Sequence, residues 1–242
     1  MEIRVFANGQ ELAHAAARRV VSVLRGRPHL VLGVPAGRTP VGIYAELVRL
    51  HAAGEADFSQ ATAFVLDEFV GIDAMHPASF HRFIREHFAG PVGLPIERLH
   101  ALNGVAGDLD AECARYEALI QRTGGIGLQL LGIGANGHIG FNEPANEQPA
   151  RTHRVTLLDG TRQASAPLFG GEVSDVPHQA LTMGLGTILK AETVILLAAG
   201  DGKAASVERM VRGAITPHLP ASFLQAHRAV EIYLDRAAAS RL

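Results

Sequence analysis

The sequence is poor in cysteine, in surplus charge and in long apolar segments, and each shortage excludes a class of protein. Cys113 is the only cysteine among 242 residues, so a disulfide within the chain and a metal site built on cysteines are both excluded. The formal net charge is −2, and no basic stripe with interleaved aromatic residues marks a nucleic-acid surface. We therefore expect a small-molecule or protein partner and no nucleic acid.

No apolar segment reaches the length that is needed to cross a bilayer. Glu2, Arg4 and Glu11 are charged where a signal peptide would have its apolar stretch. Hydrophobic residues make up 48% of the chain and charged residues 19%, as in ordinary globular proteins, and no segment resembles a linker. These features predict a cytoplasmic protein without a membrane partner, folded as a single domain over residues 1–242.

Short apolar segments of strand length alternate along the chain with segments of helical periodicity. Strands are predicted at 29–34, 61–66, 128–133, 154–158, 193–198 and 230–234, and helices at 11–24, 41–50, 79–88, 109–123 and 202–211. This alternation is typical of an α/β, Rossmann-like protein with a doubly wound, mostly parallel sheet and helices on both faces. Ligands of such sheets bind beyond the carboxyl ends of the strands, so we expect four strand ends to converge on one site.

Two glycine-containing turns at these strand ends are candidates for binding a phosphate group. Gly37, Arg38 and Thr39 lie between a predicted strand and a predicted helix, where free amides and the helix dipole favour an anion. Lys203 follows another strand, in the segment AAGDGKA, and adds a positive charge. Each turn taken alone is better explained without a ligand, with the glycines as tight turns and Lys203 as a solvated helix residue. Both turns at one edge of the sheet predict a phosphate site.

Asp67 and Glu68 directly follow the strand predicted at 61–66. A carboxylate that emerges from a buried strand tends to have a raised pKa and to face a crevice, so it can act as a base. For an isolated Asp-Glu pair the commoner role is a helix cap or a surface salt bridge. The residues that follow, FVG at 69–71, offer no helix start, which weakens the capping alternative.

The segment LQLLGIGANGHIGFNEP at 128–144 contains the pattern G-x-G-x-x-G directly after a predicted strand. Its glycines are Gly132, Gly134 and Gly137, and Asp159 follows about 20 residues later, as a dinucleotide-binding fingerprint requires. On these observations alone, a Rossmann dehydrogenase is a contender.

The residues after this pattern argue against a dinucleotide. Gly140 and Pro144 interrupt the turns in which a helix would begin, so a pyrophosphate would have no helix end to bind. His138 and Glu143 are then the informative pair, because a carboxylate that fixes one imidazole nitrogen leaves the other free for proton transfer. No second histidine stands at ligand spacing, so we expect no metal site.

Several long segments share their sequence and order with one known family. They are LGVPAGRTPVGIYAEL at 32–47, LDEFVGI at 66–72, HPASF at 76–80, LGIGANGHIGFNEPA at 131–145, RTHRVTLLDGTR at 151–162, VPHQALTMGLGTIL at 176–189 and PASFLQAH at 220–227. Through them almost the whole chain resembles the glucosamine-6-phosphate deaminases (isomerases) and, more distantly, the 6-phosphogluconolactonases. The motifs DEFVG and GFNEP resemble the deaminase branch more than the lactonase branch.

The resemblance implies an enzyme that needs no cofactor and no metal. It opens the ring of an amino-sugar phosphate, isomerises the aldose to a ketose and releases ammonia, which converts glucosamine 6-phosphate to fructose 6-phosphate. By position, Asp67 resembles the base that moves a proton from C2 to C1. His138 resembles the ring-opening acid and base, supported by Glu143 and Asn136. The residues that resemble the family's phosphate contacts are Gly37, Thr39 and Lys203.

Three features depart from the family pattern. Many members have aspartate where this chain has Asn136, which can orient His138 but cannot stabilise an imidazolium by charge. Pro167 replaces an arginine that usually binds phosphate, and Arg38 replaces a usual glycine. We hypothesise that Arg38 has taken over the phosphate from a new direction. Finally, positions 153 and 155 hold His and Val where the hexameric branch has a basic allosteric site, so we expect no activation by N-acetylglucosamine 6-phosphate.

Other functions remain open at this point. The substrate could be another amino-sugar phosphate, such as galactosamine 6-phosphate. A 6-phosphogluconolactonase would need His138 but no proton shuttle at Asp67. A non-catalytic sensor of sugar phosphates is disfavoured by the absence of a helix-turn-helix segment and by the joint presence of Asp67, His138 and Glu143. Both a monomer and a homo-oligomer are compatible with the sequence.

Overall fold

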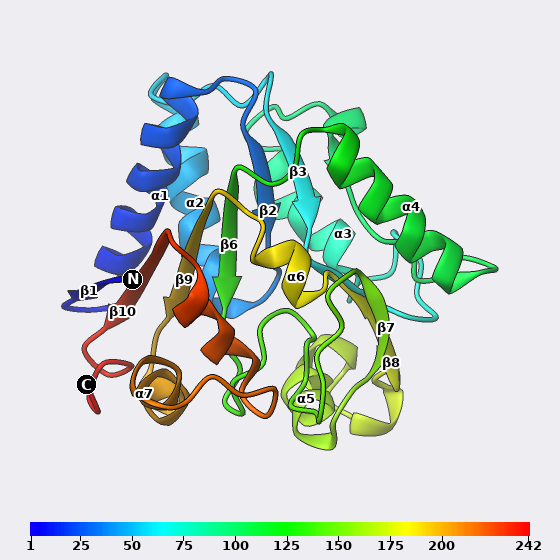
Figure 1. The fold of residues 1–242 in the computed structure, drawn as a ribbon. Coiled ribbons are helices and arrows are strands. Elements are labelled where there is room, and N and C mark those ends of the chain that lie inside the picture. Colours follow the sequence, from blue (N-terminus) through cyan, green and yellow to red (C-terminus); the bar gives the residue numbers. More distant parts are fainter.

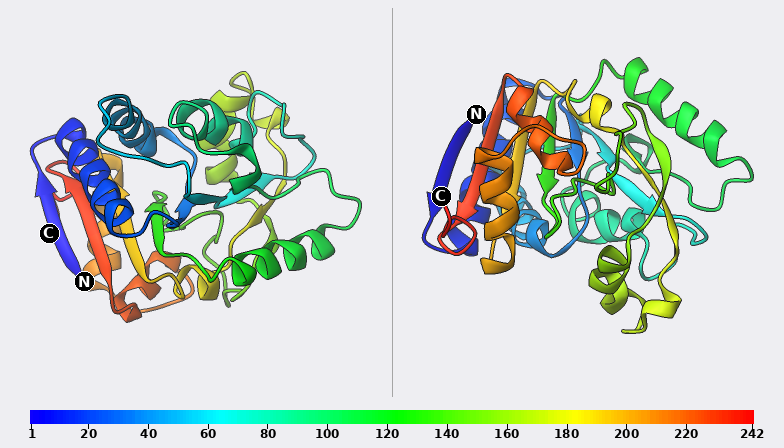
Figure 2. Two further views of the ribbon diagram at one scale, coloured as in Figure 1. Left: turned by 90° about the horizontal axis from the view of Figure 1, so that it is seen from above. Right: turned by 60° about the horizontal axis from the view of Figure 1, so that its bottom comes forward.

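The computed structural model describes residues 1–242, and a sheet of seven parallel strands runs through its centre (Figure 1). The strand order is β1 (Glu2–Phe6), β10 (Val230–Asp235), β9 (Thr193–Ala198), β6 (Leu128–Gly132), β2 (Val31–Val34), β3 (Thr62–Val65) and β5 (Leu99–His100). Helices cover both faces of this sheet (Figure 2). The predicted doubly wound, mostly parallel α/β fold is therefore confirmed.

The helices divide into two layers. One layer contains α1 (Gly9–Gly26), α2 (Arg38–Ala52), α3 (Phe80–Ile84) and the π-helical turn Arg85–Ala89 that continues α3. The other contains α4 (Leu109–Arg122), α6 (Leu185–Ile188), α7 (Ala204–Arg212) and the 3-10 helix Pro220–Ala226. Helices α1 and α4 start at side-chain caps: Asn8 accepts from two amides of α1, and Asp108 accepts from two amides of α4.

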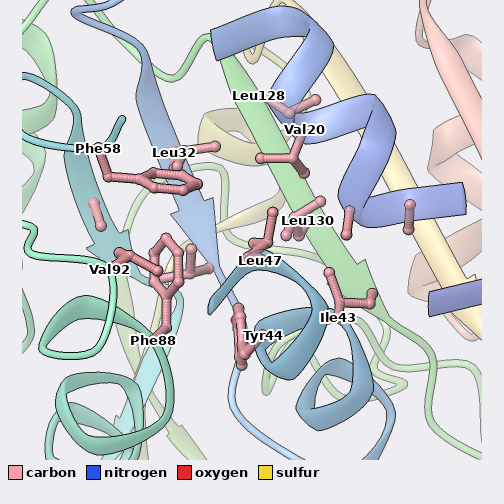
Figure 3. Packing of buried hydrophobic residues seen from close by; sticks show 14 of the residues in the cluster. Val20, Leu32, Ile43, Tyr44, Leu47, Phe58, Phe88, Val92, Leu128 and Leu130 are labelled. Carbon is pink, nitrogen blue, oxygen red and sulfur yellow. The ribbon is translucent and has the colours of Figure 1, made fainter. Parts of the chain in front are cut away.

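Each face of the sheet is buried under its own apolar core. Leu32 from β2 and Leu128 and Leu130 from β6 pack with Val20 and Leu47 of the first layer (Figure 3). Successive strand side chains point to opposite faces, and Leu131 accordingly belongs to the second core, under α4, α6 and α7. Because both faces are covered, the strands read as continuous apolar segments, which is why the sequence reveals them.

A second sheet of three antiparallel strands, which the sequence did not predict, lies beside the main one. Its order is β4 (Asp67–Phe69), β8 (Gln179–Thr182) and β7 (His153–Thr156). The strand expected at 154–158 exists as β7, but its place in the parallel sheet was predicted wrongly. β4 and β8 are three and four residues long, too short for a periodic pattern, and their hydrogen-bond partners come from distant segments.

The chain between β7 and β8 forms α5 (Asp159–Ser165) and the 3-10 helices Ala166–Phe169 and Val173–Asp175. Together with the antiparallel sheet they form the lower right part of Figure 1.

The strands β1 and β5 also escaped prediction, and the helix predicted at 202–211 starts as the 3-10 turn Asp201–Lys203 before α7. No helix of the chain combines the length and the apolar character that a membrane crossing requires.

Candidate active site

A cavity of about 660 Å³ lies at the carboxyl ends of the central strands β2 and β6. Beside β2 the sheet continues with β3 and β5, and beside β6 it continues with β9, β10 and β1. The loops that follow β2 and β6 therefore run to opposite sides and leave a crevice between them. The cavity is lined from the four predicted strand ends, by residues in 35–40, 66–67, 132–138 and 199–203. Their predicted convergence is confirmed.

Asp67 begins β4 and faces this cavity from the core. Its side chain is buried, it lines the cavity, and its carboxyl group accepts no hydrogen bond from the protein. Burial, and secondly the charge of Glu68, raise the pKa of Asp67 well above its usual range. A buried carboxyl group without a protein partner is available to take a proton from a bound ligand.

Glu68 does not line the cavity and caps a helix, which is the alternative that the segment FVG at 69–71 weakened. Its carboxylate accepts hydrogen bonds from the amides of Phe80 and His81, in the first turn of α3. The lack of a helix start at 69–71 weakened the capping alternative, but for Glu68 that alternative is correct. The capped helix begins eleven residues further along the chain, and only the tertiary fold brings its first turn to β4.

His138, Glu143 and Asn136 form a hydrogen-bonded group on the loop after β6. Glu143 Oε2 accepts from Asn136 Nδ2 at 2.9 Å and lies 3.5 Å from His138 Nδ1, an ion-pair distance longer than a normal hydrogen bond. Glu143 Oε1 accepts from the amide of Leu158, and Asn136 Oδ1 accepts from the amide of His138. Asn136 thus binds both partners, and an aspartate could not donate to Glu143 in this way.

The electrostatics of this group favour a charged Glu143. Burial raises its pKa, but the neighbouring side chains of His138 and Asn136 lower it, and the pKa of Glu143 lies below its usual value. The carboxylate therefore stays ionised beside Nδ1 of His138. Since His138 also lines the cavity, its Nε2 is the nitrogen that remains for a ligand.

The second and third glycines of the G-x-G-x-x-G pattern serve the packing of this loop. A Cβ atom at Gly134 would lie 2.4 Å from the imidazole of His138, and one at Gly137, where φ is +91°, would lie 2.1 Å from Leu219 Cδ1. No helix follows Gly137 before α5, so the expected lack of a pyrophosphate-binding helix is confirmed. Asp159, the residue that a ribose would need, has a fully exposed side chain.

The other end of the cavity carries positive charge. Gly37, Arg38 and Thr39 form the start of α2, with Gly37 at φ +117°, and Lys203 stands at the start of α7; all four line the cavity. Burial, and then the charge of Arg38, lower the pKa of Lys203, so the two cations lie close enough to act on one group. The first amides of α2 lack a side-chain cap and are available to an anion.

Sequence reasoning missed the part of the wall that comes from α5. Gly160, Thr161 and Ala164 line the cavity, and the buried Thr161 hydroxyl has no hydrogen-bond partner. Pro167, at the position of the missing arginine, is exposed in the next 3-10 helix and does not line the cavity. α5 has seven residues and two buried ones, too few for the apolar period by which helices were predicted.

Residues 7–233 of the chain match the family described as glucosamine-6-phosphate isomerases/6-phosphogluconolactonase. The chain is 46% identical over 242 residues to a glucosamine-6-phosphate deaminase of Rhodopirellula baltica, covering 100% of this chain and 96% of the relative. The solved structure of a monomeric glucosamine-6-phosphate deaminase superposes with a TM-score of 0.97 at 41% identity and full coverage of both chains. A 6-phosphogluconolactonase from Trypanosoma cruzi superposes with a TM-score of 0.79 at 20% identity, covering 100% of this chain and 96% of the other, which shows the fold alone.

Proposed function

Because the chain belongs to the family of glucosamine-6-phosphate isomerases and 6-phosphogluconolactonases, we propose that it converts glucosamine 6-phosphate and water to fructose 6-phosphate and ammonia. The full-length identity to glucosamine-6-phosphate deaminases supports this reaction over lactone hydrolysis. The observation that carries it is the buried, partner-free Asp67 at one cavity with His138 and two cations.

The phosphate group binds at the cationic end of the cavity. Lys203 and Arg38 supply the charge, and the uncapped amides at the start of α2, with the Thr39 hydroxyl, supply hydrogen-bond donors. Gly37 lets the backbone turn toward the ligand without a side chain in the way. Anchoring the phosphate here leaves the sugar carbons to extend toward Asp67 and His138, which line the same cavity.

Ring opening is the task of His138. Its Nε2 takes the proton of the anomeric hydroxyl group and delivers a proton to the ring oxygen, so that the ring C–O bond breaks and the aldehyde forms. Glu143, held by Asn136 and the amide of Leu158, stabilises the imidazolium that exists between the two transfers.

Isomerisation and loss of ammonia follow on the open chain. The Asp67 carboxylate takes the proton from C2 while the C1 oxygen takes a proton from the ammonium group of the substrate, which gives a neutral enolamine across C1 and C2. Asp67 then returns its proton to C1, which leaves a protonated imine at C2. Water adds to that imine and ammonia departs, so the ketone of fructose 6-phosphate remains. A base with a raised pKa suits the first step, because the C2 proton is a weak acid.

Ammonia release, measured separately with glucosamine, galactosamine and mannosamine 6-phosphates, tests this function. We expect turnover with glucosamine 6-phosphate, and faster turnover of galactosamine 6-phosphate would assign the chain to the other epimer. No ammonia from any of the three would contradict the proposal. Hydrolysis of 6-phosphogluconolactone in that case would identify a lactonase, and binding of the sugar phosphates without turnover would identify a sensor.

The assembly and regulation of this enzyme follow as further parts of the proposal. We expect a monomer, because the structure with TM-score 0.97 is that of a protein described as monomeric, and light scattering after gel filtration measures this. We also expect a hyperbolic rate curve that N-acetylglucosamine 6-phosphate does not change, because His153 and Val155 offer no strong cation. A sigmoidal curve relieved by that compound would contradict this expectation. The cytoplasmic location stays a prediction.

A further inference from the structure

Asp67 and Glu68 are adjacent carboxyl groups in β4 with opposite surroundings. Both side chains are buried, with 5% and 2% of the residue exposed. Asp67 lines the cavity without a hydrogen-bond partner, whereas Glu68 is fully surrounded by donors on the other face of the strand. The proposed reaction uses Asp67 and leaves Glu68 without a role.

Four donors hold the Glu68 carboxylate. Oε1 accepts from the amides of Phe69 at 3.0 Å and Phe80 at 3.2 Å, and Oε2 accepts from Ser79 Oγ at 2.7 Å and the amide of His81 at 3.1 Å. The Ser79 hydroxyl is itself an acceptor for the amide of Arg82, so its single proton points to Glu68.

This set of donors selects the ionised form of Glu68. Three of the partners are amides that can only donate, and the Ser79 hydroxyl, which already accepts from the Arg82 amide, donates its proton to Oε2. A protonated Glu68 would therefore find an acceptor only if the Ser79 hydroxyl reversed its hydrogen bond. Burial raises the pKa of Glu68, and the four hydrogen bonds oppose that rise. A negative charge is therefore held in the core, one residue away from the proposed base.

Resting on the proposed deaminase function, we propose that Glu68 is a positioning residue whose buried charge, fixed on four donors beside Asp67, makes Asp67 a stronger base toward the C2 proton. At an effective dielectric near 20, a unit charge at the distance of an adjacent residue disfavours a second negative charge by roughly one pKa unit or more. The same carboxylate ties the first turn of α3 to β4, and Phe80 of that turn lines the cavity.

Other ionisable groups that face Asp67 do not provide this negative charge. Tyr44 on α2 and Tyr116 on α4 lie near it, but their hydroxyls donate to the carbonyls of Pro35 and Val65, and burial raises both pKa values well above the usual range. Both tyrosines are therefore neutral. The remaining charged groups that line the cavity are the cations Arg38 and Lys203, the exposed carboxylate of Asp201 in the turn with Lys203, and His138, which is paired with Glu143.

The test compares the pH dependence of kcat/KM for the wild type and Glu68→Gln. Without the charge, Asp67 becomes a weaker base, so we expect the acid limb to move about one unit toward lower pH. We expect kcat on the plateau to fall by up to about tenfold, the limit for a base weakened by one unit. The phosphate and amine of the substrate titrate identically in both enzymes, so the difference between the profiles belongs to the protein.

Glu117→Gln is the matched control. Glu117 is also buried, at 5% exposure, and its carboxylate accepts from the Thr152 amide and from the hydroxyls of Thr152 and Thr187, but it does not line the cavity. We expect this variant to lose stability and to keep the wild-type pH profile. Ser79→Ala removes one donor and leaves the charge, so it too should keep the acid limb, and Glu68→Asp should restore the limb that Glu68→Gln loses.

The proposal would be overturned if folded, active Glu68→Gln kept the acid limb of the wild type. It would also be overturned if Ser79→Ala shifted the acid limb as far as Glu68→Gln does. Should Glu68→Gln not fold, infrared spectra of the wild type labelled with ¹³C-glutamate decide the matter. We expect no protonated glutamate band at pH 7, and a band from a buried protonated glutamate would overturn the proposal. If the wild type releases no ammonia, the proposed function itself fails, which is a separate outcome.

Discussion

The two ends of the cavity are built on different physical principles. At the end that we propose for proton transfer, Asp67 and Glu143 are buried side chains that start from a strand and from a tightly packed loop. At the phosphate end, Arg38 is exposed and Lys203 only partly buried, and both stand in turns at helix starts. Burial shifts a pKa strongly, whereas an anion needs only charge and free amides, which a surface turn provides.

Substitutions at the two ends of the cavity should therefore have different effects. Changes at the proton-transfer end should alter kcat and the pH dependence of stability, because they change which buried groups bind a proton. Changes at the phosphate end should act on KM, because they weaken the binding of substrate and transition state alike.

The largest effect is expected from Asp67→Asn. Loss of the base should lower kcat by about 10²–10⁴-fold and leave KM close to that of the wild type, measured by ammonia release. Asp57→Asn, at an exposed carboxylate before β3 and away from the cavity, is the control and should be fully active. Retention of most deaminase activity by Asp67→Asn would show that another group moves the C2 proton.

Lys203→Ala should have the next largest effect, on KM. A charge-assisted hydrogen bond to phosphate contributes about 1.5–3 kcal/mol, so we expect KM to rise by roughly 10- to 100-fold with a smaller change in kcat. Lys190→Ala is the matched control, because Lys190 lies outside the cavity and its loss should leave KM unchanged. A fall in kcat at unchanged KM would place Lys203 at the reacting carbons. It would contradict the assignment of phosphate binding to this end of the cavity.

Asp67→Asn should also stabilise the fold at neutral pH. Because the pKa of Asp67 is raised in the folded state, the folded protein keeps a proton that the unfolded chain releases from about pH 4 upward. The free energy of unfolding therefore falls as pH rises from there to the folded pKa, and asparagine escapes this loss. Urea unfolding at pH 5 and pH 8 should show an advantage for the variant that is larger at pH 8. An advantage that shrinks with rising pH would contradict the raised pKa.

Arg38→Ala should have the smallest effect of the four, because the guanidinium is exposed. An exposed ion pair contributes about 0.2–1 kcal/mol, so we expect KM to rise by roughly two- to fivefold, with a larger rise at low salt, where exposed charges act over longer distances. An unchanged KM at low salt would show that Arg38 has not replaced the arginine that Pro167 displaced.

Much of this site was predictable because its residues adjoin buried strands. Asp67 follows an apolar segment, Gly37 and Lys203 lie in glycine turns after two others, and His138 lies in the loop after a fourth. A parallel sheet brings such positions to one edge whatever the details of its loops. The direction of the hydrogen bond from Asn136 to Glu143 was not predictable, since the sequence does not say which amide atom faces which partner.

By itself, the sequence determined the parallel sheet, its two helical layers and the set of groups that meet at its carboxyl edge, because burial on both faces and glycine turns leave direct marks in the order of residues. Only the tertiary structure decided the antiparallel sheet, the cavity wall from α5 and the pairing of Glu68 with the start of α3. These depend on hydrogen bonds between segments far apart in the chain, and no local pattern of residues records which distant donor a carboxylate will find.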